Sequence, residues 1–258
     1  TFQNIEEKIY IKKKSKPYIE NVKYSVHGPI ISSVLDKKSR CLSLCSKALN
    51  TSKISDGILK MNMALDYHGF SKAVDLINAT QLNIIYADIQ GNIALFITGE
   101  VPIRKRGDGQ LPVDGSKGDY DWDGIIPIDQ MPKLLNPKKG YIISCNNKII
   151  DDNYPYFLGN SFMNGFRANR IDQMFSSSSK ISIEMSKKLH MDTFSIPAEK
   201  FVNGMIKGFR TAKPNAQVII DKLLNWDFNL DKDSQVATIY QVLMYILIRK
   251  LVEYDLGK

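Results

Sequence analysis

Few side chains in this sequence have the residue types and spacing that a catalytic or metal-binding site needs. The three cysteines, Cys41, Cys45 and Cys145, form no CxxC motif and no Cys/His cluster with zinc spacing. We expect them to be buried free thiols. His27 lies in a predicted strand without a Ser or Cys that would give triad chemistry, so it is interpreted as a structural histidine.

Carboxylates gather at two places in the sequence. They are Asp151-Asp152 and the alternating set Asp119, Asp121 and Asp123. Neither run has the spacing of an EF-hand loop, so we interpret both as surface loops and predict no metal site.

Two amide side chains and two guanidinium groups remain as candidates. Asn146 and Asn147 follow a predicted strand, and taken alone they are typical of a turn. Arg167 and Arg170 begin a predicted helix, and taken alone they indicate surface ion pairs.

The elements that would position these residues are strands first and helices afterwards. Extended segments are predicted at 7–13, 22–32, 40–45 and 140–145, with a hairpin at 82–87 and 93–98. Residues 102–137 contain five prolines and are predicted to form a long loop. Helices are predicted around 58–65, after the capping residues Ser55 and Asp56, and at 71–77, 166–175, 182–189, 197–209, 215–224 and 234–254.

This order predicts an α+β fold with mostly antiparallel sheet and a helical C-terminal half. Residues 1–258 are expected to form a single domain, strand-rich over 1–150 and mainly helical over 151–258. Nucleotide-binding signatures of the GxGxxG and GxxxxGK[ST] types are absent from the sequence.

The net charge of +8 favours acidic partners, but the lysines are scattered. The densest cluster, Lys12, Lys13, Lys14 and Lys16, is interpreted as a solvated strand end rather than a nucleic-acid or membrane contact. The longest apolar run, around 242–248, is shorter than the ~18 residues of a membrane span. We therefore expect neither nucleic acid nor membrane as a partner.

An ordered series of short motifs resembles the penicillin acylase family of N-terminal-nucleophile hydrolases. The motifs are His27-Gly28-Pro29, YAD-x-x-GNI at 86–93, G-x-x-P at 99–102, W-x-G-x-x-P at 122–127, NP-x-x-GYI at 136–142, Asn146-Asn147, R-x-x-RI at 167–171, Met191-Asp192-Thr193 and Trp226-Asp227. Each motif alone is weak, and the specificity comes from their order and spacing.

The resemblance implies part of a four-layer αββα sandwich, taken from within the large (beta) subunit. It also implies hydrolysis of a linear amide by a serine at the start of that subunit, whose own α-amino group is the base. This serine would lie upstream of Thr1, so the chain is expected to contain no nucleophile and to be inactive alone. Thr1 as an N-terminal threonine nucleophile is the alternative.

The resemblance assigns two site residues to this chain. Asn146 matches the oxyanion-hole asparagine, whose neutral NH₂ group can donate to the developing oxyanion. Arg167 matches an arginine that holds this asparagine and lies near the nucleophile's amine. No cofactor is expected; calcium occurs in the family, but the position near Leu158 that could supply a late aspartate is apolar.

Three functions remain open at this stage. The chain is a fragment of an amidohydrolase for N-acyl amides such as β-lactam side chains or acyl-homoserine lactones, or a non-catalytic remnant or docking subunit of a split enzyme, or a polyanion-binding protein. Expected partners are the remaining acylase segments, a companion chain, or a second copy.

Overall fold

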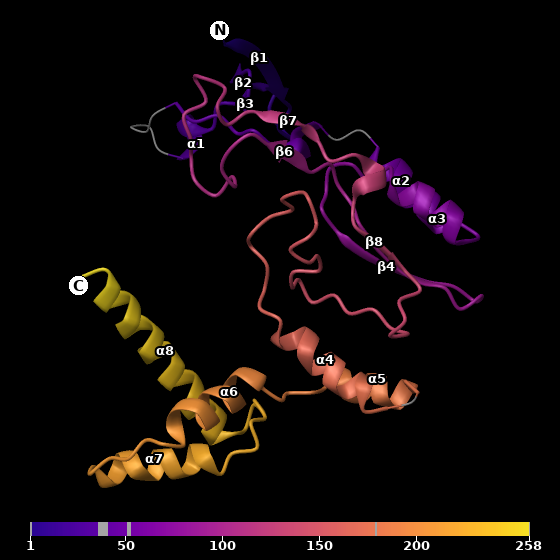
Figure 1. Cartoon of the computed structure of the whole chain (residues 1–258). Coiled ribbons are helices and arrows are strands. Elements are labelled where there is room, and N and C mark those ends of the chain that lie inside the picture. The colour runs from indigo at the N-terminus through magenta and orange to yellow at the C-terminus, as the bar shows by residue number, and fades with distance from the viewer. Residues whose placement is uncertain (1, 36–40, 51–52, 179, 258) are drawn as a thin grey trace. The chain divides into compact units, whose positions relative to one another are not determined.

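A computed structural model describes residues 2–35, 41–50, 53–178 and 180–257, so Thr1 lies outside the described residues. Their contacts divide the chain into two compact units (Figure 1). Unit 1 contains Thr1–Ser144 and Lys148–Phe162, and unit 2 contains Cys145–Asn147 and Met163–Lys258. The expectation of a single domain stays a prediction.

Unit 1 begins with an antiparallel sheet in the order β1 (Gln3–Ile9), β2 (Tyr18–Ser25) and β3 (Gly28–Pro29). In this sheet Ile5 pairs with Val22 and Tyr24 with Pro29. A short helix α1 (Ser32–Leu35) and a 3₁₀ turn η1 (Lys47–Asn50) follow. The strands predicted at 7–13 and 22–32 correspond to β1 and to β2 with β3, each displaced toward the N-terminus. The strand predicted at 40–45 is wrong: its described residues form only an isolated bridge between Ser43 and Ile30, because no longer edge pairs with them.

The predicted hairpin is confirmed and forms the centre of a second sheet. Its strands are β4 (Asn83–Ala87) and β5 (Ile93–Ile97), and β8 (Lys133–Leu135) pairs with the other side of β5. Helices α2 (Ile54–Met63) and α3 (Tyr67–Val74) pack their apolar side chains on one face, around the fully buried Phe96.

The capping residues predicted for α2 are wrong, because the helix begins before them. Lys53 is the N-cap and makes no side-chain cap, so Ser55 and Asp56 lie in the first turn. There the Asp56 carboxylate accepts from Lys60 at 2.9 Å, an i,i+4 pair on the helix surface.

The long loop predicted over 102–137 contains short strands instead. β6 (Pro102–Arg104) pairs with β7 (Trp122–Ile125), and a 3₁₀ turn η2 (Ile128–Gln130) leads into β8. Strands of three or four residues beside Pro and Gly are too short to produce a clear alternation. Conversely, residues 140–145 were predicted to be a strand and pair with no described strand, because β propensity needs a neighbouring edge to become a strand.

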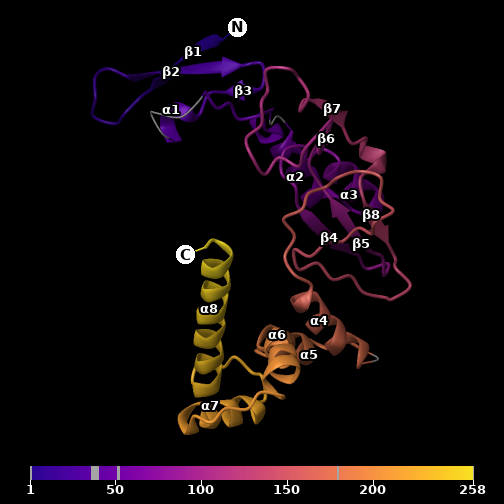
Figure 2. The ribbon, with the colours of Figure 1, turned by 60° about the vertical axis from the view of Figure 1, so that its left-hand side comes forward.

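Unit 2 is helical, as the sequence predicts (Figure 2). Its helices are α4 (Phe166–Ser176), α5 (Ile183–His190), α6 (Ile196–Phe201), α7 (Pro214–Leu224) and α8 (Gln235–Asp255), with a π-helical turn η3 (Val202–Ile206) continuing α6. The core of unit 2 gathers around Leu223, Trp226 and Tyr240. The fold is therefore α+β with antiparallel sheets, as expected.

Helix α8 extends beyond this core. Ala237 and Tyr240 in its first half are buried, whereas Tyr245, Ile248 and Leu251 in its second half are more than half exposed. α8 is long and apolar enough to cross a membrane, with a mean hydropathy of 1.2 over 18 residues. No uninterrupted apolar run in α8 is this long, because polar residues are interspersed among its apolar ones. One such helix, packed into a core at its beginning, is weak support for a membrane span.

Candidate functional site

The turn at Cys145–Asn147 carries the candidate oxyanion donor. Asn146 has a φ of 61°, in the left-handed region that asparagine tolerates better than most residues. Its carbonyl oxygen accepts from the Met163 N–H at 2.8 Å. On the other side of the turn, the Cys145 N–H donates to Oδ1 of Asn147 at 3.1 Å. These contacts fix the backbone on both sides of the Asn146 side chain.

Arg167 lies in the first turn of α4 and binds this turn directly. Its Nη2 donates to the carbonyl oxygen of Cys145 at 2.6 Å and to Oδ1 of Asn146 at 2.9 Å. The helix begins after Gly165, where Oδ1 of Asn164 accepts from the Phe166 N–H at 3.3 Å. The structure thus brings together the two residues singled out in the sequence.

The contact decides which atom of the Asn146 amide can meet a ligand. A guanidinium only donates, so the atom it binds is the acceptor Oδ1, and the NH₂ group is turned away from Arg167. Among the described residues none accepts a hydrogen bond from this NH₂, and Asn146 is exposed. The arrangement therefore presents a neutral, oriented donor.

Arg170, one turn further along α4, forms the ion pair expected of it. Its Nε and Nη2 each donate to a different oxygen of Asp192 at 2.7 Å. These hydrogen bonds raise the pKa of the Arg170 guanidinium above its ordinary value. Its Cζ also lies 4.3 Å from the centre of the Phe194 ring.

His27 lies in the turn between β2 and β3 rather than in a strand, which corrects its predicted location. Its Nε2 is 2.8 Å from Oδ1 of Asp121. The hydrogen bond links this turn to the segment before β7, in agreement with a structural histidine.

The adjacent carboxylates Asp151 and Asp152 make contacts within their own loop. Oδ1 of Asp151 accepts from the Asn153 N–H at 2.9 Å, and Asp152 pairs with Lys148, which lowers the pKa of Asp152. Within the described ranges, no group of three or more His, Cys, Asp or Glu side chains is arranged to hold a metal ion.

The thiols are free, but only Cys145 is buried; Cys41 and Cys45 are exposed. The expectation of buried thiols is therefore wrong for two of them. Among the described residues of this part, 41–46 are irregular apart from an isolated β-bridge between Ser43 and Ile30, so these thiols do not lie in a packed strand.

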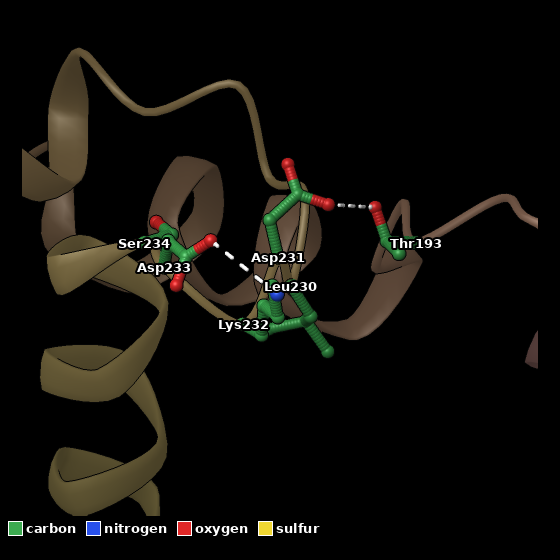
Figure 3. A pocket seen from close by; sticks show the side chains of 6 residues that line it. All are labelled: Thr193, Leu230, Asp231, Lys232, Asp233 and Ser234. Atoms are coloured by element: carbon green, nitrogen blue, oxygen red, sulfur yellow. Dashed lines mark hydrogen bonds and ion pairs between the residues drawn. The ribbon is translucent and has the colours of Figure 1, made fainter.

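A hollow in unit 2 is a separate feature (Figure 3). It has a volume of about 740 Å³ and lies at the start of α8. Its lining residues are Thr193, Leu230, Asp231, Lys232, Asp233 and Ser234. Neither Asn146 nor Arg167 contributes to it, so the hollow is not the predicted site.

The sequence model of the penicillin amidase family matches residues 1–258. The chain belongs to the penicillin amidase family. It is 27% identical over 231 residues to the penicillin acylase 2 proenzyme of Pseudomonas sp. (strain SE83), covering 86% of this chain and 29% of that protein. It is also 27% identical over 269 residues to the acyl-homoserine lactone acylase QuiP of Pseudomonas aeruginosa, covering 95% of this chain and 32% of that protein.

The fold of this penicillin amidase family member matches a solved acylase. Similarity to the thermostable penicillin G acylase from Alcaligenes faecalis has a TM-score of 0.69 at 21% identity, over 91% of this chain and 42% of that chain. The chain spans about a third of the length of the two curated relatives above. Its family and fold are thereby established, while the activity of a whole protein is a separate question.

Several residues of the site were not predicted. The carbonyl of Cys145 and the N–H of Met163 are backbone groups, and their role cannot be predicted from residue type because every residue has a carbonyl and nearly every residue an N–H. Asp192 lies 22 residues from Arg170 along the chain, so only the folded structure reveals the pair. In unit 1, the motif residues Asp88, Asn92 and Asn136 are joined by hydrogen bonds: the Asn92 amide donates to Asp88, and the Asn136 amide donates to Oδ1 of Asn92. Oδ1 of Asn136 also accepts from the Ile93 N–H, so these residues hold the hairpin to β8.

Proposed function

We propose that this chain forms the oxyanion-stabilising part of an amidohydrolase that cleaves N-acyl amides. Asn146 is the oxyanion donor, Arg167 holds it, and the nucleophile comes from a segment outside this sequence. The supporting observation is the 2.9 Å contact from Nη2 of Arg167 to Oδ1 of Asn146, which leaves the NH₂ group as the exposed donor. Membership of the penicillin amidase family supports the reaction class.

The proposed reaction proceeds by acyl transfer to a serine hydroxyl. The hydroxyl oxygen attacks the amide carbon while its proton passes to the terminal amine, and negative charge develops on the former carbonyl oxygen. The Asn146 NH₂ donates to this oxygen. Collapse of the intermediate breaks the C–N bond, the proton leaves with the amine, and water then hydrolyses the acyl ester.

A neutral donor suits this step because the amide is uncharged both before attack and in the tetrahedral intermediate. Since Arg167 already orients it, the donor needs no reorganisation when the charge develops. The Arg167 guanidinium contributes by fixing Oδ1 and by its positive charge near the site. Relatives named as penicillin acylase and acyl-homoserine lactone acylase support β-lactam side-chain amides and acyl-homoserine lactones as substrates to test.

The test compares the chain alone with the chain completed by a segment that begins with a serine nucleophile. We expect no turnover of a chromogenic phenylacetyl amide or an acyl-homoserine lactone by the chain alone, and turnover by the completed enzyme. Asn146→Gly should then lower kcat about 10² to 10³-fold. Full activity of the Asn146→Gly enzyme, or activity of the chain alone that is lost in Thr1→Ala, would contradict the proposal.

The same proteins distinguish this proposal from a docking subunit and from a polyanion-binding protein. A docking subunit without catalysis would bind the companion segment but give no turnover in any combination. Polyanion binding would appear as salt-sensitive retention on heparin that is lost when Lys12 to Lys16 are neutralised. Lys12, Lys13 and Lys14 lie exposed between β1 and β2, as expected for a solvated strand end.

A further inference from the structure

We propose that Asp192 is a positioning residue for Arg167, acting through Arg170 and the first turns of α4. It thereby determines which atom of the Asn146 amide faces the substrate. The inference rests on the proposed function only for the role of Asn146; the positioning itself is a property of unit 2.

The Arg170–Asp192 contact differs from the ordinary ion pairs of this chain. Both carboxylate oxygens are engaged by different nitrogens, and the two side chains are only 28% and 16% exposed. The pair Arg249–Glu253 on α8 has a single contact at 2.7 Å and is 65% and 41% exposed. A bidentate pair that is partly buried fixes orientation as well as distance, whereas an exposed pair does neither.

Helix geometry transmits this orientation to Arg167. Residues three apart lie on neighbouring positions of one helix face, so Arg167 and Arg170 move together when α4 rotates about its axis. Any rotation that takes Nη2 of Arg167 away from Asn146 therefore also breaks the fork between Arg170 and Asp192. The stacking of Arg170 on Phe194 opposes the same rotation.

Asp192 is itself anchored to the core of unit 2. The Leu230 N–H donates to the Thr193 carbonyl at 2.9 Å, and Oγ1 of Thr193 donates to Asp231 at 2.8 Å (Figure 3). The Phe194 ring meets Phe228, whose ring lies 5.6 Å from that of Trp226 in the core. The carboxylate thus belongs to a fixed platform.

Cys145 provides a probe of the turn in the full chain. It is 8% exposed, and its carbonyl accepts from Arg167, so its thiol should react only when the turn opens. When Cys41 and Cys45 are replaced by Ser, Cys145 is the one cysteine left in the sequence. We expect Asp192→Asn and Arg170→Lys to speed its labelling by a maleimide about tenfold, and the matched Arg249→Lys to leave it within about twofold.

A double-mutant cycle identifies the route of the effect. If Asp192 acts through Arg167, Asp192→Asn should add no further acceleration in an Arg167→Ala chain. The ¹⁵N resonance of the Asn146 side-chain amide should shift in Asp192→Asn and Arg170→Lys but not in Arg249→Lys. Should Asp192→Asn fail to fold, Arg170→Lys carries both measurements, because it keeps the charge and loses the fork.

Unchanged Cys145 labelling and an unchanged Asn146 resonance in folded Asp192→Asn or Arg170→Lys would overturn the inference. An additive effect in the Arg167→Ala chain would overturn it as well. Neither readout depends on turnover, so failure of the positioning role is distinguishable from failure of the proposed function, which would appear as full activity of the Asn146→Gly enzyme.

Discussion

At the scale of single residues, the Asn146 backbone and its side chain make opposite demands on substitution. The backbone has a positive φ, which favours Gly, whereas the side chain supplies the donor, which Gly lacks. The two roles can therefore be separated experimentally.

We predict that Asn146→Gly unfolds at a denaturant concentration close to that of the wild type. Asn146→Ala should be less stable than Asn146→Gly by about 1 kcal/mol, because a Cβ is strained in the left-handed region. Both variants should lose the same activity in the completed enzyme. Equal stability of the two variants would show that the turn relaxes to a different backbone conformation.

At the scale of elements, the hairpin β4–β5 is held by a hydrogen-bond network around Asp88. Its carboxylate accepts from the Asn92 N–H, the Asn92 amide and the Tyr86 hydroxyl at 2.8–2.9 Å. These bonds lower the pKa of Asp88, the side-chain bond from Asn92 being the largest cause. Desolvation, with help from the bond to Asp88, raises the pKa of Tyr86 to about 12.

We predict that the hairpin loses stability above pH 10. Since the folded pKa of Tyr86 lies above the value of about 10 for an unfolded chain, its contribution is complete below pH ~10 and is lost as pH rises toward 12. Phenolate absorbance should show a late-titrating tyrosine that is absent in Tyr86→Phe. If Tyr86→Phe retains this late phase, the phase belongs to another tyrosine.

The sequence predicts those elements whose signals are local. The hairpin was predictable because β-branched runs flank Gly91-Asn92, and α7 because Pro214 suits a first turn. β6 and β7 were missed because so few residues show no periodicity, and the strand predicted at 140–145 lacked a partner that sequence cannot supply. Asn146 and Arg167 were found through resemblance; their residue types alone indicate a turn and a surface ion pair.

At the scale of the whole molecule, the second half of α8 leaves apolar side chains uncovered. Tyr245, Ile248, Leu251 and Val252 are each at least half exposed, although α8 begins in the core of unit 2 (Figure 2). Apolar surface of this kind marks an interaction surface, and the remaining acylase segments or a second copy are the partners we propose.

We predict that the chain alone self-associates at high concentration through this half of α8. Light scattering should report a mass that rises with concentration, and Ile248→Lys should lower it because the new charge would be buried in the contact. Gln241→Lys, which adds the same charge at an exposed polar position of α8, is the control. A monodisperse wild-type monomer would contradict the prediction.

Chain connectivity gives the site one further property. The three residues Cys145–Asn147 belong to unit 2 by their contacts, yet both neighbouring stretches of chain belong to unit 1. In a chimaera joined at residue 163, Arg167 and Asp192 would therefore come from one parent protein and Asn146 from the other. Such a chimaera should keep the Arg167–Asn146 contact only if the turn of one parent fits the start of α4 from the other. Substitutions in the turn and at the start of α4 should therefore depend on one another.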